Sequence, residues 1–342
     1  MDLLPTPEQE EIAASVAAVL ARELPADRRR ELLSASVPID RDLWSRAAGL
    51  GWFTLGLPEA LGGVGYGLPE EALVFRQIGA ALAPGPFAAT VVAARLAAVA
   101  GDLQLAAAIG AGELVVGLGS VRAGARTALA REVTADLDLY DASWADLVLL
   151  VEPDAAVLVE ASLLDGVTEL ACIDDATRLA TGRFESAAVR ARSLDVDDLW
   201  QRGAVLVAAQ LAGMAEAVRD RATAYAKVRV QFGQPIGAYQ AVKHACADMA
   251  VRAEAALSQV LFAAVAVETG RPDAAFQASA AKIVAVDAAR RNAAANVQIH
   301  GGMGFTFEQD AHLYLKRSHL LDQAFGSTTL HLALALERAP QD

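Results

Sequence analysis

The chain has 342 residues, which is enough for two or three domains, and its composition is 54% apolar with a net charge of −13. The negative charge argues against nucleic acid as a partner, because neutralising phosphates needs clustered Lys and Arg. No run of about 18 uninterrupted apolar residues occurs, so no membrane span is predicted. The first residues lack a basic segment before an apolar run, so no signal peptide is predicted and the expected location is cytoplasmic.

Cysteine and histidine usage gives no indication of a disulfide framework or a metal site. Cys172 and Cys246 are too few for a disulfide scaffold and lack metal-ligand spacing. The five histidines form neither a His-x-x-x-His nor a His-Glu-x-x-His pattern. We therefore predict no metal ligands.

The first third of the chain is predicted to be helical. Pro7 suits the first turn of a helix, acids follow it, and Ile12, Val16 and Leu20 form an apolar stripe. Similar patterns predict five helices, over residues 6–24, 40–48, 69–81, 86–100 and 105–111. They predict a helical N-terminal domain over residues 1–112.

The residue pattern then changes to short apolar or β-branched runs bounded by Gly, Asp or Pro. Such runs are typical of strands, and they occur at residues 114–118, 146–151, 155–159 and 168–173. We expect a small middle β-domain over residues 113–190.

Long helical patterns return in the last part of the chain. Helices are predicted over residues 199–227, 239–269, 274–297, 310–323 and 328–337. Antiparallel helices joined by short turns form a bundle, here over residues 191–342. The predicted fold class is mainly α with a small β-domain.

A glycine-rich stretch interrupts this C-terminal helical region. Gly301, Gly302 and Gly304 follow Gln298-Ile299-His300, and each would cost roughly 1 kcal/mol relative to Ala inside a helix. Glycines there suit either a turn with positive φ or a place where another molecule approaches the backbone. Taken alone, the stretch fits a plain helix-to-helix turn and a ligand site equally well.

A second motif lies 69 residues earlier, counted from Arg229 to Gln298. It reads Arg-x-x-Phe-Gly-x-x-Ile from Arg229, and it is followed by Gln240-Ala241-Val242 and then by Ala-Asp-Met-Ala at residues 247–250. Together the motifs resemble the acyl-CoA dehydrogenase family. The resemblance covers about the last 140 residues specifically, the first third weakly, and the middle poorly.

The resemblance implies a known fold and a flavin cofactor. The fold has an N-terminal helical domain, a middle β-domain and a C-terminal helical bundle. The cofactor is FAD, and the family's contacts to it fall in this chain on Arg229, Gln231, Phe232, Gln240, Gln298, Gly301 and Gly302. In the family these two motifs reach across a dimer interface to the flavin of the neighbouring subunit. Arg229 offers a planar guanidinium suited to a pyrophosphate, although by itself it would also suit a solvated or helix-capping position.

The chain has no carboxylate at either position that the family uses for its catalytic base. Family members remove an α-proton with a carboxylate and transfer a β-hydride to the flavin. Phe325 stands at the usual position of that carboxylate, and Gly203 at the alternative one. We therefore assign no catalytic residue. The nearby acids Asp195, Asp197, Asp198 and Glu216 fit helix N-termini and solvated faces better than a relocated base.

The middle stretch also lacks the family's flavin-ring elements, the Thr-Glu-Pro-x-Ala-Gly-Ser-Asp signature and the Trp-Ile-Thr strand. Ser143-Trp144-Ala145-Asp146 keeps only the Ala-Asp that opens a strand. Elements that act within one subunit are thus missing, and those that act on a neighbour are kept. Residues 304–315 most resemble actinobacterial members of steroid side-chain degradation that work as unequal pairs.

Three hypotheses follow from this pattern. The first is a base-lacking subunit that completes the FAD site of a sister acyl-CoA dehydrogenase subunit. The second is a self-sufficient enzyme with a relocated base, and the third is a flavin-free structural subunit. The resemblance implies an acyl-CoA thioester as substrate and an electron-transfer flavoprotein or similar protein as electron acceptor.

Overall fold

The structure is a computed structural model that describes residues 4–34, 39–122, 132–142, 144–153, 155–193 and 197–339. The chain divides into two compact units, and each unit is built from segments that are not consecutive in the sequence. One unit contains Met1–Arg22, Ala72–Ala83 and Ala204–Asp342, and the other contains Glu23–Glu71 and Pro84–Gly203. The three expected domain boundaries therefore remain a prediction.

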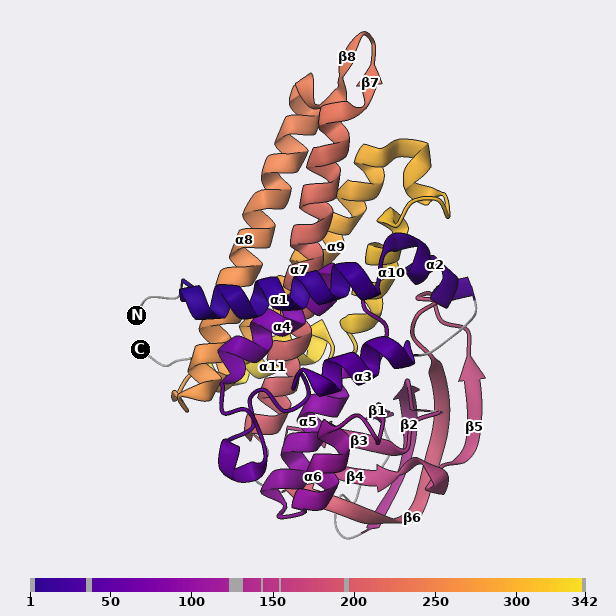
Figure 1. Cartoon of the computed structure of the whole chain (residues 1–342), viewed down its shortest axis with the longest axis vertical. Helices are drawn as coiled ribbons and strands as arrows, with labels where there is room; N and C mark the ends of the chain where they lie inside the picture. Colours follow the sequence, from indigo (N-terminus) through magenta and orange to yellow (C-terminus); the bar gives the residue numbers. More distant parts are fainter. Residues whose placement is uncertain are drawn as a thin grey trace. The chain divides into compact units, whose positions relative to one another are not determined.

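The first third of the chain is helical, as predicted (Figure 1). Its helices are α1 (Pro7–Glu23), α2 (Ala26–Ser34), α3 (Arg41–Gly49), α4 (Leu68–Ala80), α5 (Phe87–Val99) and α6 (Leu103–Gly110), with a short 3₁₀ turn, η1 (Glu59–Leu61). Helix α2 was not expected, because its three consecutive arginines interrupt any apolar pattern with helical spacing. Helix α3 begins where Asp40 caps it by accepting hydrogen bonds from the backbone N–H groups of Asp42 and Leu43.

The middle of the chain forms a β-barrel. Its strands are β1 (Val116–Val121), β2 (Glu132–Tyr140), β3 (Leu147–Glu152), β4 (Ala155–Glu160), β5 (Asp165–Leu170) and β6 (Leu179–Ser193), with a short 3₁₀ turn, η2 (Ala161–Leu163), between β4 and β5. The sheet order is β2-β1-β3-β4-β6-β5, and a further pairing of β2 with β6 closes five strands into a barrel. Only β1 and β3 run parallel; β5 pairs with β6 outside the closed ring.

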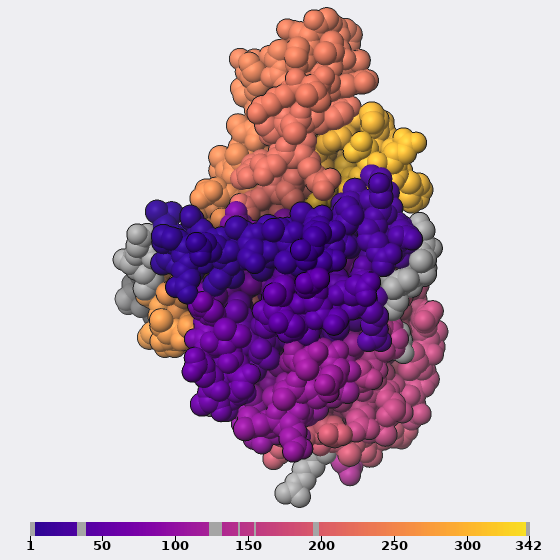
Figure 2. All heavy atoms as spheres, in the orientation of Figure 1, coloured from indigo at the N-terminus to yellow at the C-terminus, as the bar shows by residue number. Residues whose placement is uncertain are grey.

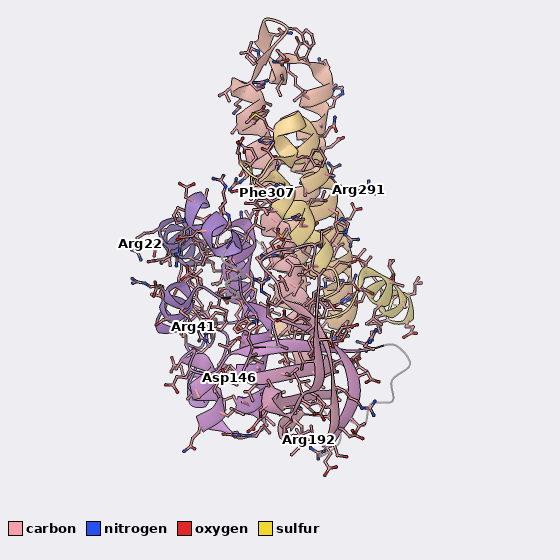
Figure 3. The ribbon with its side chains drawn as sticks, turned by 90° about the vertical axis from the view of Figure 1, so that its right-hand side faces the viewer. Arg22, Arg41, Asp146, Arg192, Arg291 and Phe307 are labelled. Atoms are coloured by element: carbon pink, nitrogen blue, oxygen red, sulfur yellow. The ribbon has the colours of Figure 1, made fainter. Side chains whose placement is uncertain are left out.

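The barrel is filled with side chains. Alternate residues of β2 point inward, from Val133 through Leu137 to Leu139, and they meet Phe184 of β6 and Leu150 of β3 in one buried cluster. At the start of β3 the carboxylate of Asp146, labelled in Figure 3, accepts a hydrogen bond from the backbone N–H of Val115 at 2.8 Å. Asp146 therefore has a structural role.

Two strands of the barrel, β2 and β6, were not predicted. Strand β2 alternates apolar and charged residues, which is a period-two signal. Strand β6 is rich in Ala and Arg and contains a Gly, so its composition does not favour a strand. The predicted strand at residues 168–173 is shifted, because β5 ends at Leu170.

The long C-terminal helices lie close to their predicted positions. They are α7 (Asp197–Val228), α8 (Gln240–Glu268), α9 (Ala274–His300), α10 (Ala311–Leu321) and α11 (Thr328–Glu337). Between α7 and α8 lie strands β7 (Val230–Gln231) and β8 (Gln234–Pro235) and the turn η3 (Ile236–Ala238), and η4 (Gly301–Phe305) follows α9. The prediction of a helical bundle is confirmed.

Two features hold these helices in register. The Asn292 amide of α9 donates to the carbonyls of Ala215 in α7 (3.1 Å) and Met249 in α8 (2.9 Å), and its oxygen accepts from Arg252 (2.8 Å). One buried side chain thus joins three helices. At Gly213, an added Cβ would lie 1.9 Å from a backbone carbonyl oxygen of α4, so the α4 and α7 backbones touch there.

Helix α8 is the one described helix that is long and apolar enough to cross a membrane by length and composition. Its most apolar window is 39% buried, and the helix packs along α9. Core helices of bundles pass the same test, so this feature alone carries no membrane assignment.

Candidate functional site

The seven residues predicted to contact a cofactor lie on one compact unit and are all exposed. Three belong to the hairpin between α7 and α8, namely Arg229, Gln231 and Phe232; Gln240 is the first residue of α8. The remaining three are Gln298 at the end of α9 and Gly301 and Gly302 in η4. Figure 2 shows that no other segment covers the hairpin end of α7 and α8 in that view.

The hairpin is a two-residue β-turn. Phe232 (φ 51°) and Gly233 (φ 81°) both have positive φ, as a type I′ hairpin turn requires. Val230 pairs with Pro235 and Gln231 with Gln234. Because Phe232 is not a glycine, it adopts this conformation at a cost, yet its side chain is 94% exposed and packs little against its own chain.

Tyr239, the residue before α8, holds the hairpin through a hydrogen bond and a ring contact. Its hydroxyl donates to the backbone oxygen of Gln231 at 3.3 Å, and its ring meets that of Phe232 edge to face at 6.5 Å. The amide of Gln231 donates to the carbonyl of Val230 at 2.9 Å. These contacts engage the side chains of Tyr239 and Gln231, and they leave a charged group of the hairpin without a partner in the described chain.

That group is the guanidinium of Arg229. The backbone of Arg229 is held by Tyr225 and Ile236, at 2.9 and 2.8 Å. Its side chain is exposed and makes no ion pair or hydrogen bond with any residue in the described part of the chain. A fork of N–H donors in this state is available to an anion.

The glycine turn at the end of α9 has one glycine whose added Cβ would clash with the chain and two whose added Cβ would meet open space. An added Cβ on Gly304 would lie 2.6 Å from the carbonyl oxygen of Val297, so Gly304 is required by packing within the chain. Gly301 has φ 60°, and a Cβ on Gly301 or Gly302 would meet nothing within 4 Å. Internal packing therefore does not explain Gly302, whose bare backbone is open to approach from outside.

Tyr225 couples the hairpin to the glycine turn. Its ring stacks on His300 with centroids 4.2 Å apart and planes at 19°, and its hydroxyl lies 3.7 Å from the sulfur of Met303. His300 is buried and donates from Nδ1 to the carbonyl of Asn296 at 2.8 Å. Tyr225 and His300 are 75 positions apart, and no local pattern in the sequence pairs them.

Large apolar side chains surround these polar groups. Val228 and Val230 are exposed beside Arg229, and Phe305 and Phe307 are exposed after the glycine turn. Phe307, labelled in Figure 3, is 83% exposed. Several large apolar side chains exposed on neighbouring turns are compatible with a protein interaction site.

No carboxylate occupies either position of the family's base. Phe325 has φ 54° and a side chain that is 4% exposed, and Gly203 lies within α7. Glu216 is engaged by Arg76 through two hydrogen bonds of 2.5 and 2.9 Å. An acid held in a bidentate pair is not free to move toward a substrate.

Asp198 is engaged in the same way. Its two oxygens accept from Arg95 at 2.9 Å and from Arg202 at 2.6 Å, and Arg202 also pairs with buried Glu71 at 3.5 Å. Asp195 and the side chain of Asp197 lie outside the described residues. The structural interpretation of Asp198 and Glu216 is thereby favoured over a relocated base.

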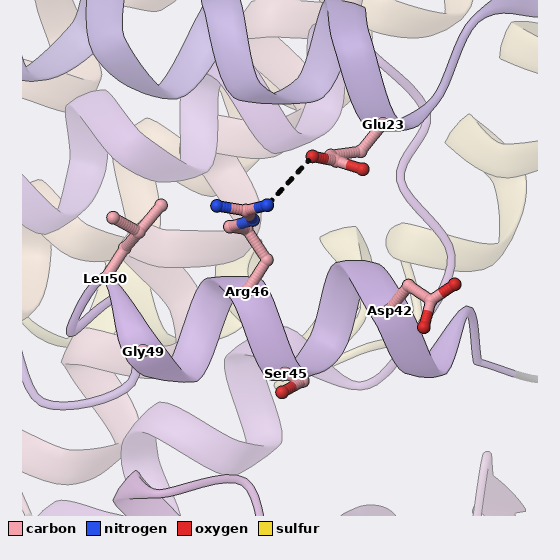
Figure 4. A pocket seen from close by; sticks show the side chains of 6 residues that line it. All are labelled: Glu23, Asp42, Ser45, Arg46, Gly49 and Leu50. Carbon is pink, nitrogen blue, oxygen red and sulfur yellow. Dashed lines mark ion pairs between the residues drawn. The ribbon is translucent and has the colours of Figure 1, made fainter.

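Two hollows on the described surface lie elsewhere. The larger one, about 600 Å³, is lined by Glu23, Asp42, Ser45, Arg46, Gly49 and Leu50, and an ion pair of 3.7 Å joins Arg46 to Glu23 across it (Figure 4). A second hollow lies beside α2 and α3. Neither contains a predicted cofactor residue.

Comparison with known proteins identifies the family. The model of the acyl-CoA dehydrogenase C-terminal domain matches residues 199–339, and that of the N-terminal domain matches residues 6–108. Acyl-CoA dehydrogenase FadE34 of Mycobacterium tuberculosis is 35% identical over 293 residues, which cover 84% of this chain and 40% of FadE34. Acyl-CoA dehydrogenase IpdE2 of the same organism is 31% identical over 93% of this chain and 92% of its own length.

Solved structures share the fold at low sequence identity. The ChsE4–ChsE5 complex of Mycobacterium tuberculosis contains a chain that matches with a TM-score of 0.88 at 23% identity, covering 100% of both chains. Butyryl-CoA dehydrogenase of Megasphaera elsdenii matches with a TM-score of 0.84 at 21% identity, covering 98% of this chain and 99% of its own. The expected fold is confirmed, and the chain belongs to the acyl-CoA dehydrogenase family, with relatives among the actinobacterial members.

Proposed function

We propose that this chain is the base-lacking subunit of a hetero-oligomeric acyl-CoA dehydrogenase and completes the FAD site of a sister subunit. The observation that carries the proposal is the state of Arg229. Its guanidinium is exposed without a partner in the described chain, and Tyr225 couples its hairpin to the open backbone of Gly301 and Gly302. The chain thus offers an anion-binding group, yet it has no carboxylate at residues 203 and 325.

The exposed residues fit one end of FAD. Arg229 would pair with the pyrophosphate through two parallel N–H···O bonds. Gln231, Gln240 and Gln298 would supply amide groups, Gly301 and Gly302 would allow close approach of backbone N–H groups, and Phe232 would pack on the cofactor. When bound, the flavin accepts a hydride from the β-carbon of the acyl-CoA. The residues of this chain bind and orient the cofactor and move no proton.

The rest of the site would come from the partner. The exposed apolar residues that flank Arg229 and the glycine turn give the partner a surface to bury. Two structural neighbours are named as pairs, the ChsE4–ChsE5 complex and the Tcur3481–Tcur3483 steroid ACAD, the second with a TM-score of 0.85 at 22% identity. FadE34 is long enough to hold a second segment of this size beside the part that matches.

The substrate class and the electron acceptor follow from the same proposal. An acyl-CoA thioester, with a fatty acyl or steroid side chain as the acyl group, would bind in the partner's site. Electrons would leave through an electron-transfer flavoprotein or a similar protein in the cytoplasm. A solved structure named for the electron-transferring flavoprotein of Acidaminococcus fermentans contains a chain with the same fold, with a TM-score of 0.85 at 23% identity.

The alternative is a self-sufficient enzyme with a relocated base, and the ion pairs weigh against it. Glu216 and Asp198 are held by arginines, and deprotonating a carbon acid needs a carboxylate that is free to accept a proton. A flavin-free structural subunit would leave the unpartnered guanidinium of Arg229 and the open glycines without a role.

The test is purification of the chain alone and together with an acyl-CoA dehydrogenase encoded beside it. Alone, the chain should be colourless or aggregated. Co-expression should give a stable complex with flavin absorbance at one flavin for each pair of unlike chains. A yellow homo-oligomer that oxidises acyl-CoA would refute the partner-subunit proposal and favour a relocated base, and a stable complex free of flavin would favour the structural subunit.

A further inference from the structure

Lys282 of α9 is fully buried, with 0% of its surface exposed, and none of the roles proposed above uses it. Its ammonium donates to three backbone carbonyls of the turn that follows α10, those of Asp322 (3.3 Å), Ala324 (2.5 Å) and Gly326 (3.1 Å). An ammonium has three N–H donors and no acceptor. The three donors therefore match three acceptors, which only the charged form can satisfy.

The position of the ammonium suits a cation. Helix α10 ends at Leu321, and the last carbonyls of a helix lack partners within it and carry partial negative charge. Asp322, the C-cap residue, contributes one of the three oxygens. Rings of backbone carbonyls replace the water around monovalent cations in the same manner.

His331 of α11 satisfies a further carbonyl of this turn. Its Nε2 donates to the oxygen of Phe325 at 3.0 Å, because a carbonyl only accepts, and its Nδ1 then accepts from the hydroxyl of Ser279 at 3.3 Å. Burial, and secondly the charge of Lys282, lower the pKa of His331 to about 3. His331 is therefore neutral at physiological pH, with its tautomer fixed by these two partners.

The carboxylate of Asp322 completes the network. One oxygen accepts from the backbone N–H and the hydroxyl of Thr328 (2.9 and 2.5 Å), and the other accepts from Arg290 (2.8 Å). Burial raises the pKa of Asp322, but these hydrogen bonds and the charges of Arg290 and Lys282 hold it below its ordinary value. The acid thus stays ionised beside the ammonium.

We infer that Lys282 is an internal cation that positions the Asp322–Gly326 turn, and with it Phe325 and the start of α11. The turn holds the non-glycine Phe325 at positive φ (54°), a conformation that costs energy and needs support from its surroundings. Apolar packing cannot give that support, because the carbonyls around Lys282 and His331 would lose their donors. The inference concerns this turn alone and does not depend on a partner subunit or a flavin.

The first experiment uses the wild-type chain, labelled with ¹⁵N in its four lysines. Lys227 and Lys243 are exposed and Lys316 is partly exposed, so the protons of their ammonium groups should exchange rapidly with water. Burial lowers the pKa of Lys282 to about 7, with Asp322 opposing this shift. Below that pH we expect one slowly exchanging ammonium signal, absent in Lys282→Met. A neutral amine or no protected signal would overturn the inference.

The second experiment is chemical rescue followed by hydrogen–deuterium exchange. Lys282→Ala should speed exchange of the segment 322–331 at least about tenfold, which corresponds to about 1.4 kcal/mol. Ammonium or methylammonium should slow it again in this variant, relative to sodium at the same ionic strength, and should leave the wild type unchanged.

Val286→Ala is the matched control, because it removes buried apolar atoms from the same helix and removes no charge. Any loosening of segment 322–331 that it causes should not respond to ammonium. Equal rescue of both variants, equal rescue by sodium, or unchanged exchange in Lys282→Ala would each overturn the inference.

Discussion

Replacement of Arg229 by alanine is the most direct test of the flavin contact proposed for this chain. A pyrophosphate would accept two charge-assisted hydrogen bonds from the guanidinium, each worth roughly 1.5–3 kcal/mol when fully formed. Arg229 lies on a surface hairpin and is exposed in the chain alone, so part of that energy is offset by lost hydration. We expect a net loss of about 1.4–3 kcal/mol, or one to two orders of magnitude in FAD affinity.

The assay is a flavin titration of wild-type and variant complexes, with assembly checked by light scattering. Arg229→Lys should recover only part of the loss, because a point charge lacks the planar fork. Lys227→Ala is the matched control, since Lys227 is an exposed cation two residues away and its replacement removes the same charge. Unchanged affinity in Arg229→Ala with the complex intact, or an equal loss in Lys227→Ala, would refute the proposed bidentate contact.

Three other changes test separate parts of the structure. Phe325→Glu restores a carboxylate but should give no acyl-CoA oxidation by the chain alone with an artificial electron acceptor; turnover would mean that the chain holds a working flavin site. The lowered pKa of His331 implies stability that is present above pH 6.5 and lost as pH falls toward 3. Wild type should therefore lose up to about 1.4 kcal/mol per pH unit more than His331→Gln in that window, as measured by urea unfolding, whereas exposed His244→Gln should follow wild type. Gly213→Ala should destabilise by at least about 2 kcal/mol in thermal unfolding despite the better helix propensity of Ala, and Gly49→Ala, which has open space around its Cβ, should not.

The sequence predicted the helices of this chain well and the barrel poorly, for a physical reason. Helices α7 to α11 carry their own periodicity and their own stop signals, such as the Gly270-Arg271-Pro272 break. Strand β6 is stabilised by its pairing with β2, β4 and β5, and the paired residues lie between 9 and 56 positions apart in the sequence. Its Ala- and Arg-rich composition carries no trace of that pairing.

The candidate site likewise has features that could be predicted from local sequence motifs and features that could not. The motifs at Arg229 and Gln298 could be found because their residue types and spacing are local patterns that a family keeps. The stack of Tyr225 on His300 and the carbonyls around Lys282 depend on which helices meet in three dimensions. A lone lysine in an Ala-rich helix gives no sign in the sequence that it is buried.

Asn292 has a consequence for the geometry of the proposed cofactor site. Its side chain ties α7, α8 and α9 together, and the hairpin grows from the first two of these helices while the glycine turn ends the third. A sliding motion of one helix past the others would break at least one of its hydrogen bonds and leave a buried amide unsatisfied. The distance between Arg229 and Gly302 is therefore set when the chain folds. A cofactor that spanned them, as proposed, would meet helices already held in register, and the ordering cost of its binding would fall on side chains such as that of Arg229.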